Sequence, residues 1–152
     1  SDSVRTVLWF NGRGREAAEF YTSLIPNSRI VASYTGDEGP ARFEVIDFTL
    51  GGVAYQILDA GPYFQLSEAV SIMVNTPDQA ETDRLWAALT AEGGQESMCG
   101  WLKDRFGLSW QICPERLLQI MSGPDRAKAG RAMTALMTMK KIDLAAIEAA
   151  AD

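Results

Sequence analysis

The sequence predicts an α+β fold in which two βαβββ units are followed by a helical tail. The main observation is an internal repeat: a strand-like stretch, a turn and a helical pattern over residues 8–24 recur over residues 72–89. Residues 52–57 likewise recur as residues 107–112. The matched positions are about 55–65 residues apart, which is too long for a solenoid repeat and favours a duplicated supersecondary unit. A second observation is the Gly51-Gly52 pair between two strand-like stretches, which is typical of a β-hairpin.

The first unit is expected at about residues 4–59. It opens with an apolar run of strand-forming residues, and its helix has apolar residues at helical spacing. Gly, Pro and acidic residues at 36–40 indicate a loop. The predicted elements are a strand at 4–10, a helix at 15–24, and strands at 29–35, 43–50 and 53–58.

The second unit is expected at about residues 69–114, after a connector rich in Gly, Pro and aromatic residues. Asp78 favours the start of its helix, and Gly93-Gly94 ends it. The predicted elements are a strand at 69–74, a helix at 78–91, and short strands near 96–99, 101–104 and 108–113.

The tail, about residues 115–152, has no counterpart in the first half. We expect helices at 116–122 and 125–141, and a last helix that Asp143 caps. A methionine-rich stripe runs along the second of these helices. Its simplest interpretation is a packing face, and the alternative is a surface that recruits a partner.

The composition indicates one ordinary globular domain, residues 1–152, of 152 residues with a net charge of −6. This charge argues against a nucleic-acid partner, and no apolar run approaches the roughly 18 residues that span a bilayer. The N-terminus shows no signal-peptide pattern, and Cys99 and Cys113 are expected to be free thiols of a cytoplasmic protein. The chain contains no histidine, which removes Ser-His-Asp triads and His-ligated metal sites.

Several motifs resemble one family in detail. They are Trp9-Phe10-Asn11-Gly12, residues 16–21, residues 26–28, Gly61-Pro62, Phe64, residues 67–69 and, most specifically, the long run at 99–111. Together they resemble the PhnB-like branch of the vicinal oxygen chelate superfamily, which includes glyoxalase I, extradiol dioxygenases and bleomycin-resistance proteins. This branch is often labelled the 3-demethylubiquinone-9 3-methyltransferase domain. The resemblance covers almost the whole chain and implies a curved mixed sheet around a cleft, with the helices outside.

The resemblance also implies where a metal would bind. In metal-using members, each half supplies one ligand from its first strand and one from its last strand. The corresponding positions here are Arg5, Gln56, Ala69 and Gln111. A guanidinium repels a cation, alanine offers no ligand atom, and the two amides carry no charge, so this set does not suit a divalent ion. We therefore expect neither a catalytic metal nor another cofactor.

Strand alternation gives a candidate ligand pocket within the expected cleft, because alternate side chains point to opposite faces of a sheet. The predicted ligand-binding residues are Arg5, Trp9, Gln56, Ser71, Ser109 and Gln111. Arg5 would favour an anionic or carbonyl-bearing ligand, the two glutamines would orient a polar head, and Trp9 would supply an apolar wall. Strand alternation also places Cys113 on the cleft side, but no histidine can activate Cys99 or Cys113, so both are most simply small buried apolar residues. No catalytic residue is assigned. Glu68 is either an acid–base group or a hydrogen-bonded link between the halves.

Two classes of function remain. The first is a metal-free protein that binds a small, partly aromatic or amphipathic molecule, in the manner of bleomycin-resistance proteins. The alternative is an enzyme of the superfamily: a lyase, a dioxygenase or a ubiquinone-type methyltransferase. Methyl-donor sites commonly use a glycine-rich loop, of which Gly12-Arg13-Gly14 is only a fragment. We further expect a homodimer in which the tail packs against the partner, because the duplicated unit has edge strands to cover.

Overall fold

The computed structural model describes residues 3–37 and 42–152. The chain divides into two compact units, Ser1–Leu66 and Ser67–Asp152. Most of the loop predicted at 36–40 lies outside the described residues. No helix in the described ranges has both the length and the apolar character that a membrane span requires.

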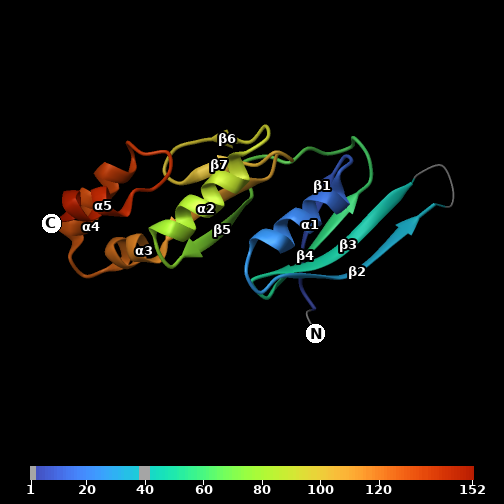
Figure 1. Ribbon diagram of the computed structural model, residues 1–152, viewed down its shortest axis with the longest axis horizontal. Coiled ribbons are helices and arrows are strands. Elements are labelled where there is room, and N and C mark those ends of the chain that lie inside the picture. Colours follow the sequence, from blue (N-terminus) through green and yellow to red (C-terminus); the bar gives the residue numbers. More distant parts are fainter. Residues whose placement is uncertain (1–2, 38–41) are drawn as a thin grey trace. The chain divides into compact units, whose positions relative to one another are not determined.

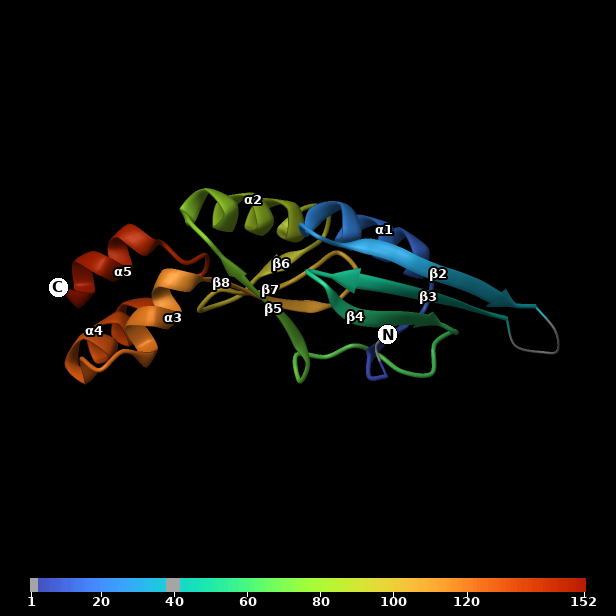
Figure 2. The same ribbon diagram turned by 90° about the horizontal axis from the view of Figure 1, so that it is seen from below.

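Unit 1 is a four-stranded mixed sheet with one helix. Its elements are β1 (Thr6–Phe10), α1 (Gly14–Leu24), β2 (Arg29–Gly36), β3 (Phe43–Leu50) and β4 (Val53–Asp59). The strand order is β1-β4-β3-β2, with β1 parallel to β4 and the other pairs antiparallel. The predicted hairpin turn is present, since Gly51 and Gly52 join β3 to β4 with positive φ angles of 55° and 83°. Helix α1 lies along one side of the sheet (Figures 1 and 2).

Unit 2 repeats this topology. Its elements are β5 (Ser71–Thr76), α2 (Gln79–Thr90), β6 (Gln95–Glu96), β7 (Trp101–Lys103) and β8 (Ser109–Pro114). The strand order is β5-β8-β7-β6, again with the first and last strands parallel. The side chain of Asp78 accepts a hydrogen bond from the backbone N–H of Glu81, which confirms Asp78 as the cap of α2. The two predicted βαβββ units are thus both present.

One face of each sheet packs against its helix. In unit 1, Leu8, Ile46 and Ile57 are buried together with Tyr21 of α1. In unit 2, Trp110 and Ile112 are buried, as are three residues of α2: Leu85, Trp86 and Leu89. We call the other side of each sheet its open face. In β1, Val7 on the open face is 50% exposed whereas its neighbour Leu8 is 2% exposed, so the predicted alternation is confirmed there.

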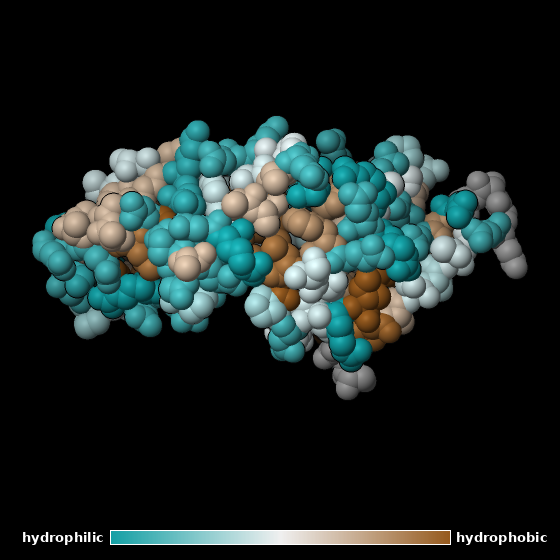
Figure 3. Space-filling model, in the orientation of Figure 1, coloured by the Kyte–Doolittle hydropathy of each residue, from teal (hydrophilic) through white to brown (hydrophobic). Residues whose placement is uncertain are grey.

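Strand β2 is an edge of the unit 1 sheet, and most of its residues are exposed. Hydrophobic residues, coloured brown in Figure 3, gather beside β2, and Val31 of this strand is 50% exposed. The pairing with β3 shifts register between Ile30 and Ala32, which is a bulge of the kind that protects exposed edges. The homodimer stays a prediction.

The tail contains three helices: α3 (Glu115–Ser122), α4 (Arg126–Leu136) and α5 (Leu144–Ala151). The helix predicted at 125–141 is therefore too long. The carbonyls of Met139 and Lys140 accept hydrogen bonds of 2.7 and 2.8 Å from the backbone N–H groups of Cys99 and Gly100. At the end of α4, the backbone N–H groups of Thr138 and Met139 donate to carbonyls three residues back, Ala135 and Leu136, so the α-helical ladder stops at Leu136 although the helical pattern continues.

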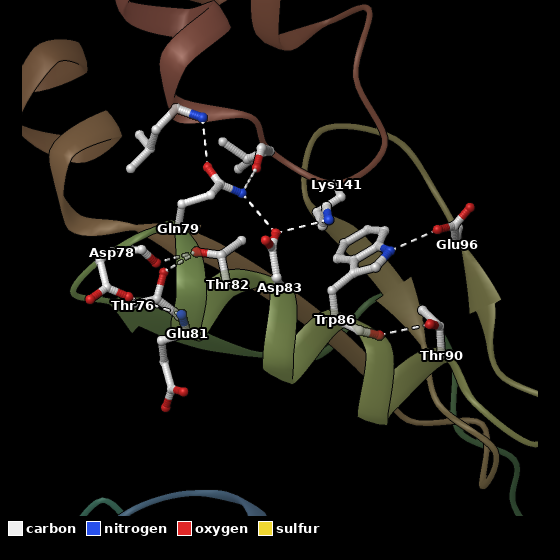
Figure 4. Close-up of polar contacts among 12 residues, drawn as sticks. Thr76, Asp78, Gln79, Glu81, Thr82, Asp83, Trp86, Thr90, Glu96 and Lys141 are labelled. Atoms are coloured by element: carbon white, nitrogen blue, oxygen red, sulfur yellow. Dashed lines mark hydrogen bonds and ion pairs between the residues drawn. The ribbon is translucent and has the colours of Figure 1, made fainter.

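Hydrogen bonds and an ion pair bind the tail to helix α2 of its own unit. The side-chain amide of Gln79 donates to the carbonyl of Ile142 (2.9 Å) and accepts from the backbone N–H of Leu144 (2.8 Å). An ion pair of 2.8 Å joins Lys141 to Asp83, as Figure 4 shows. Asp143 caps α5 as predicted, since its side chain accepts from the backbone N–H of Ala146. Packing of the tail against a partner subunit stays a prediction.

Candidate functional site on the open faces

The open face of unit 1 carries a polar network on three neighbouring segments. In the sheet register, Gln56 of β4 lies between Val7 of β1 and Asp47 of β3. The Asp47 carboxylate oxygen Oδ1 accepts a hydrogen bond of 2.8 Å from Gln56 Nε2 and forms an ion pair of 3.1 Å with Arg5 Nη1. The structure therefore brings Arg5 and Gln56 together through Asp47. The sequence analysis assigns Asp47 no role, although the register that the two-residue Gly51-Gly52 turn sets could have placed it opposite Gln56.

An aromatic cluster lies in the same unit. Trp9 donates its Nε1–H to the carbonyl of Gly61 at 2.8 Å. Its ring meets Phe64 edge-on at a centroid distance of 4.9 Å, and Tyr63 at 6.3 Å. Phe64 and Tyr63 are both largely exposed. Edge-to-face aromatic groups of this kind can accept a further ring. That Trp9 forms the apolar wall of a ligand pocket stays a prediction, to which the structure adds the two neighbouring connector residues.

The open face of unit 2 repeats the glutamine but not its partners. Gln111 Nε2 donates to Ser71 Oγ at 2.9 Å, so these two predicted residues are brought together. Ser109 lies opposite Ser71 in the register of β5 and β8. It is 1% exposed, and its Oγ has no hydrogen-bond partner among the residues that the structure describes. A buried hydroxyl without a partner costs folding free energy, so Ser109 is an unusual feature of this face.

A charged pair borders Ser109. Lys103 of β7 lies opposite Ser109 in the register and forms an ion pair with Glu68, which precedes β5. The hydrogen bond from the Lys103 ammonium, aided by its charge, holds the pKa of the Glu68 carboxyl below its usual value. Glu68 thus contacts a residue of its own unit.

The six predicted ligand-binding residues fall into two groups. Arg5, Trp9 and Gln56 belong to unit 1, whereas Ser71, Ser109 and Gln111 belong to unit 2. That all six line one pocket stays a prediction. Cys113 is buried among residues of the tail, as expected of a small apolar residue and not of a reactive thiol, and this burial raises the pKa of its thiol. The reason is that α3 follows β8 directly and the tail covers its end.

The donor atoms at the four positions that the resemblance implies do not suit a metal ion. Arg5 and Gln56 are both bound to Asp47, Gln111 is bound to Ser71, and Ala69 has no ligand atom. Divalent ions need carboxylates, imidazoles or thiolates. Within residues 3–37 and 42–152, no three His, Cys, Asp or Glu side chains gather where they could hold a metal ion. A metal-free site stays a prediction that this donor chemistry supports.

Comparison with known proteins gives the family. The model of the 3-demethylubiquinone-9 3-methyltransferase family matches residues 2–113. The PhnB protein from Bacillus cereus is 31% identical over 74% of this chain and 99% of that chain, with a TM-score of 0.67.

Two more distant structures share the fold. The fosfomycin resistance protein FosX from Listeria monocytogenes is 14% identical, covers 77% of this chain and 97% of its own, and has a TM-score of 0.53. The trypanothione-dependent glyoxalase I from Leishmania major is 13% identical, covers 78% and 90%, and has a TM-score of 0.55. The search among curated proteins found no match. The chain therefore belongs to the PhnB-like 3-demethylubiquinone-9 3-methyltransferase family, and it shares its fold with the fosfomycin resistance protein and glyoxalase I.

Proposed function

We propose that this protein binds a small, partly aromatic molecule with a carboxylate or carbonyl group, and that it does so without a metal ion. The observation that carries the proposal is the replacement of metal ligands by hydrogen-bonding groups at the equivalent positions Gln56 and Gln111. Both glutamines are half-buried on the open faces and are held in place by neighbours. Groups held in this way are preorganised for a ligand, which lowers the cost of binding.

Arg5 and Trp9 supply the chemistry for the two ends of such a ligand. A guanidinium has five N–H donors, so Arg5 can hold Asp47 and still donate to a ligand oxygen. Trp9 and the exposed Phe64 offer an aromatic surface in the same unit. Small-molecule sites typically combine an apolar wall with a few fixed polar groups, as these residues do.

A titration with 2-naphthoate, followed by NMR of the ¹⁵N-labelled protein, tests this proposal. We expect the indole N–H signal of Trp9 and the side-chain amide signal of Gln56 to shift in a saturable manner. Arg5→Met should weaken binding by about tenfold, since one charge-assisted hydrogen bond is lost. Arg29→Met, which removes an exposed arginine at the start of β2, is the matched control and should have no effect.

Two results would contradict the proposal. One is the absence of any shift of the Trp9 and Gln56 signals up to about 10 mM 2-naphthoate. Such a result means that the binding free energy is smaller in magnitude than about 3 kcal/mol. The other is elemental analysis that finds close to one equivalent of Zn, Ni, Fe or Mn in the purified protein.

A further inference from the structure

Unit 2 contains a pocket beside its β6–β7 edge, which we call the Ser109 pocket. It has a volume of about 150 Å³, and the lining residues used below are Glu68, Gln95, Glu96, Trp101, Lys103 and Ser109. This is roughly the volume that five water molecules occupy in the liquid. The pocket therefore suits a very small molecule or one end of a larger one.

The sheet register explains why these side chains meet. Gln95 of β6 lies opposite Lys103 of β7, which lies opposite Ser109 of β8. Residues directly opposite each other on neighbouring strands project from the same face, so the three polar side chains form one row on the open face. Ser109 is the buried member of this row, and its hydroxyl is the one without a hydrogen-bond partner among the described residues.

A carboxylate already occupies part of the pocket. The carboxylate of Glu68 forms an ion pair with Lys103, although the Glu68 side chain is 64% exposed. The other acidic residue of the lining, Glu96, accepts a hydrogen bond of 2.7 Å from Trp86 Nε1, and Figure 4 shows it directed at that indole. The open-face row thus carries one ammonium group, and an exposed, displaceable carboxylate is bound to it.

We propose that the Ser109 pocket binds a small monocarboxylate, which takes the place of Glu68 on Lys103 and accepts a hydrogen bond from the Ser109 hydroxyl. The single positive charge of Lys103 matches a monoanion rather than a dianion. Trp101, which lines the pocket and is partly buried, contacts the apolar end of the ligand. Binding gives the Ser109 hydroxyl the partner that it lacks.

Propionate, which is about the size of the pocket, is the probe. We expect it to shift the indole N–H signal of Trp101 in an NMR titration. Glu68→Gln should strengthen binding several-fold, because a neutral amide competes less well for Lys103. Lys103→Met should abolish binding, whereas Lys128→Met, which removes a lysine paired with Asp152 in the tail, should leave it unchanged.

Ser109→Ala separates a binding role from a structural one. It should weaken propionate binding by about tenfold, yet leave the Tm of the free protein unchanged or raised, since the hydroxyl has no partner to lose. A fall in the Tm of the free protein would show a structural partner and overturn the proposal. The proposal would also be overturned if neither the wild type nor Glu68→Gln bound propionate. It would likewise be overturned if inorganic phosphate or propylammonium bound more tightly than propionate.

The pocket contains Ser109, one of the six predicted ligand-binding residues, but none of the residues from which the proposed function is argued. The two are distinguishable, because propionate is read at Trp101 and 2-naphthoate at Trp9. Loss of the propionate response alone overturns the pocket, and loss of the naphthoate response alone overturns the function proposed above.

Discussion

The two units have the same strand order and carry a glutamine at the same position, but the partners of the two glutamines differ. In unit 1, Asp47 lies opposite Gln56, whereas in unit 2 Trp101 lies opposite Gln111. Gln111 bonds instead to Ser71 on the strand at its other side. The duplicated backbone thus places equivalent amides, and the residue opposite decides whether the amide contacts an ion pair or a hydroxyl.

The hairpins before the glutamines differ as well. Unit 1 uses the two-residue turn of Gly51 and Gly52, in which the backbone N–H of Gly51 donates to Ser28 Oγ. Unit 2 uses a longer turn organised by the buried Asp104, whose carboxylate accepts from Phe106 N, Leu108 N and Trp110 Nε1. The same strand pair is therefore closed by backbone conformation in one unit and by a side chain in the other.

The largest effect is expected at this turn. Asp104→Ala leaves three buried or half-buried N–H groups without their acceptor, which should lower the free energy of unfolding by about 3 kcal/mol. Ser28→Ala, the counterpart in unit 1, removes two exposed hydrogen bonds, one from Gly51 N–H and one to the Pro26 carbonyl, and should cost about 0.5 kcal/mol because both are open to water. Urea denaturation of both variants checks this, and equal losses would show that the two turns do not differ in the way described.

The next largest effect concerns the tail, which only unit 2 carries. Gln79→Ala removes two hydrogen bonds between α2 and the tail backbone, so it should destabilise the tail by about 2 kcal/mol. Hydrogen exchange should accelerate in α5 and stay unchanged in α1. Gln119→Ala, an exposed glutamine of α3, is the control. Unchanged exchange in α5 would contradict the anchoring role of Gln79.

A smaller effect compares the two glutamines directly. Gln56→Ala removes a hydrogen bond to a charged group and should cost about 1.5 kcal/mol, whereas Gln111→Ala removes one to a hydroxyl and should cost about 0.5 kcal/mol. Chemical denaturation gives both values. A larger loss for Gln111→Ala would reverse the distinction drawn between the two open faces.

The smallest effect is a pH dependence of the tail. Hydrogen bonds from Lys141 and Gln79 hold the pKa of Asp83 below its usual value. A carboxyl group whose pKa is lowered by folding stabilises the folded state above its unfolded pKa of about 3.9, and this contribution disappears as the pH falls through the lower, folded value. The protection of the α5 amides, measured relative to their intrinsic exchange rates at each pH, should therefore fall in acid, and less so in Asp83→Asn. An equal fall in both proteins would contradict the role of Asp83.

Much of the fold follows from local patterns. Strand alternation predicts that Leu8 is buried and that its neighbours are not, and the helix caps Asp78 and Asp143 act as their positions indicate. The end of α4 could not be predicted in this way. Its helical pattern runs on, but the chain closes the helix with hydrogen bonds three residues back, and the residues that follow bond to Cys99 and Gly100, far away in the sequence.

The candidate site was predictable only in part, for a similar reason. Alternation assigns Gln56, Ser109 and Gln111 to one side of their strands, but it does not show which residue lies opposite. The role of Asp47 depends on the β3–β4 register, and the burial of Ser109 depends on how its neighbours pack. Both are properties of the folded sheet rather than of a single strand.

The central claim is that Gln56 and Gln111 are hydrogen-bonding groups and not metal ligands. Paramagnetic broadening by Mn²⁺ tests it most directly, because a bound Mn²⁺ ion broadens the NMR signals of the groups around it. With one equivalent of Mn²⁺, we expect the side-chain amide signals of Gln56 and Gln111 to remain as sharp as they are with excess EDTA. Selective loss of both amide signals at less than one equivalent would contradict the claim.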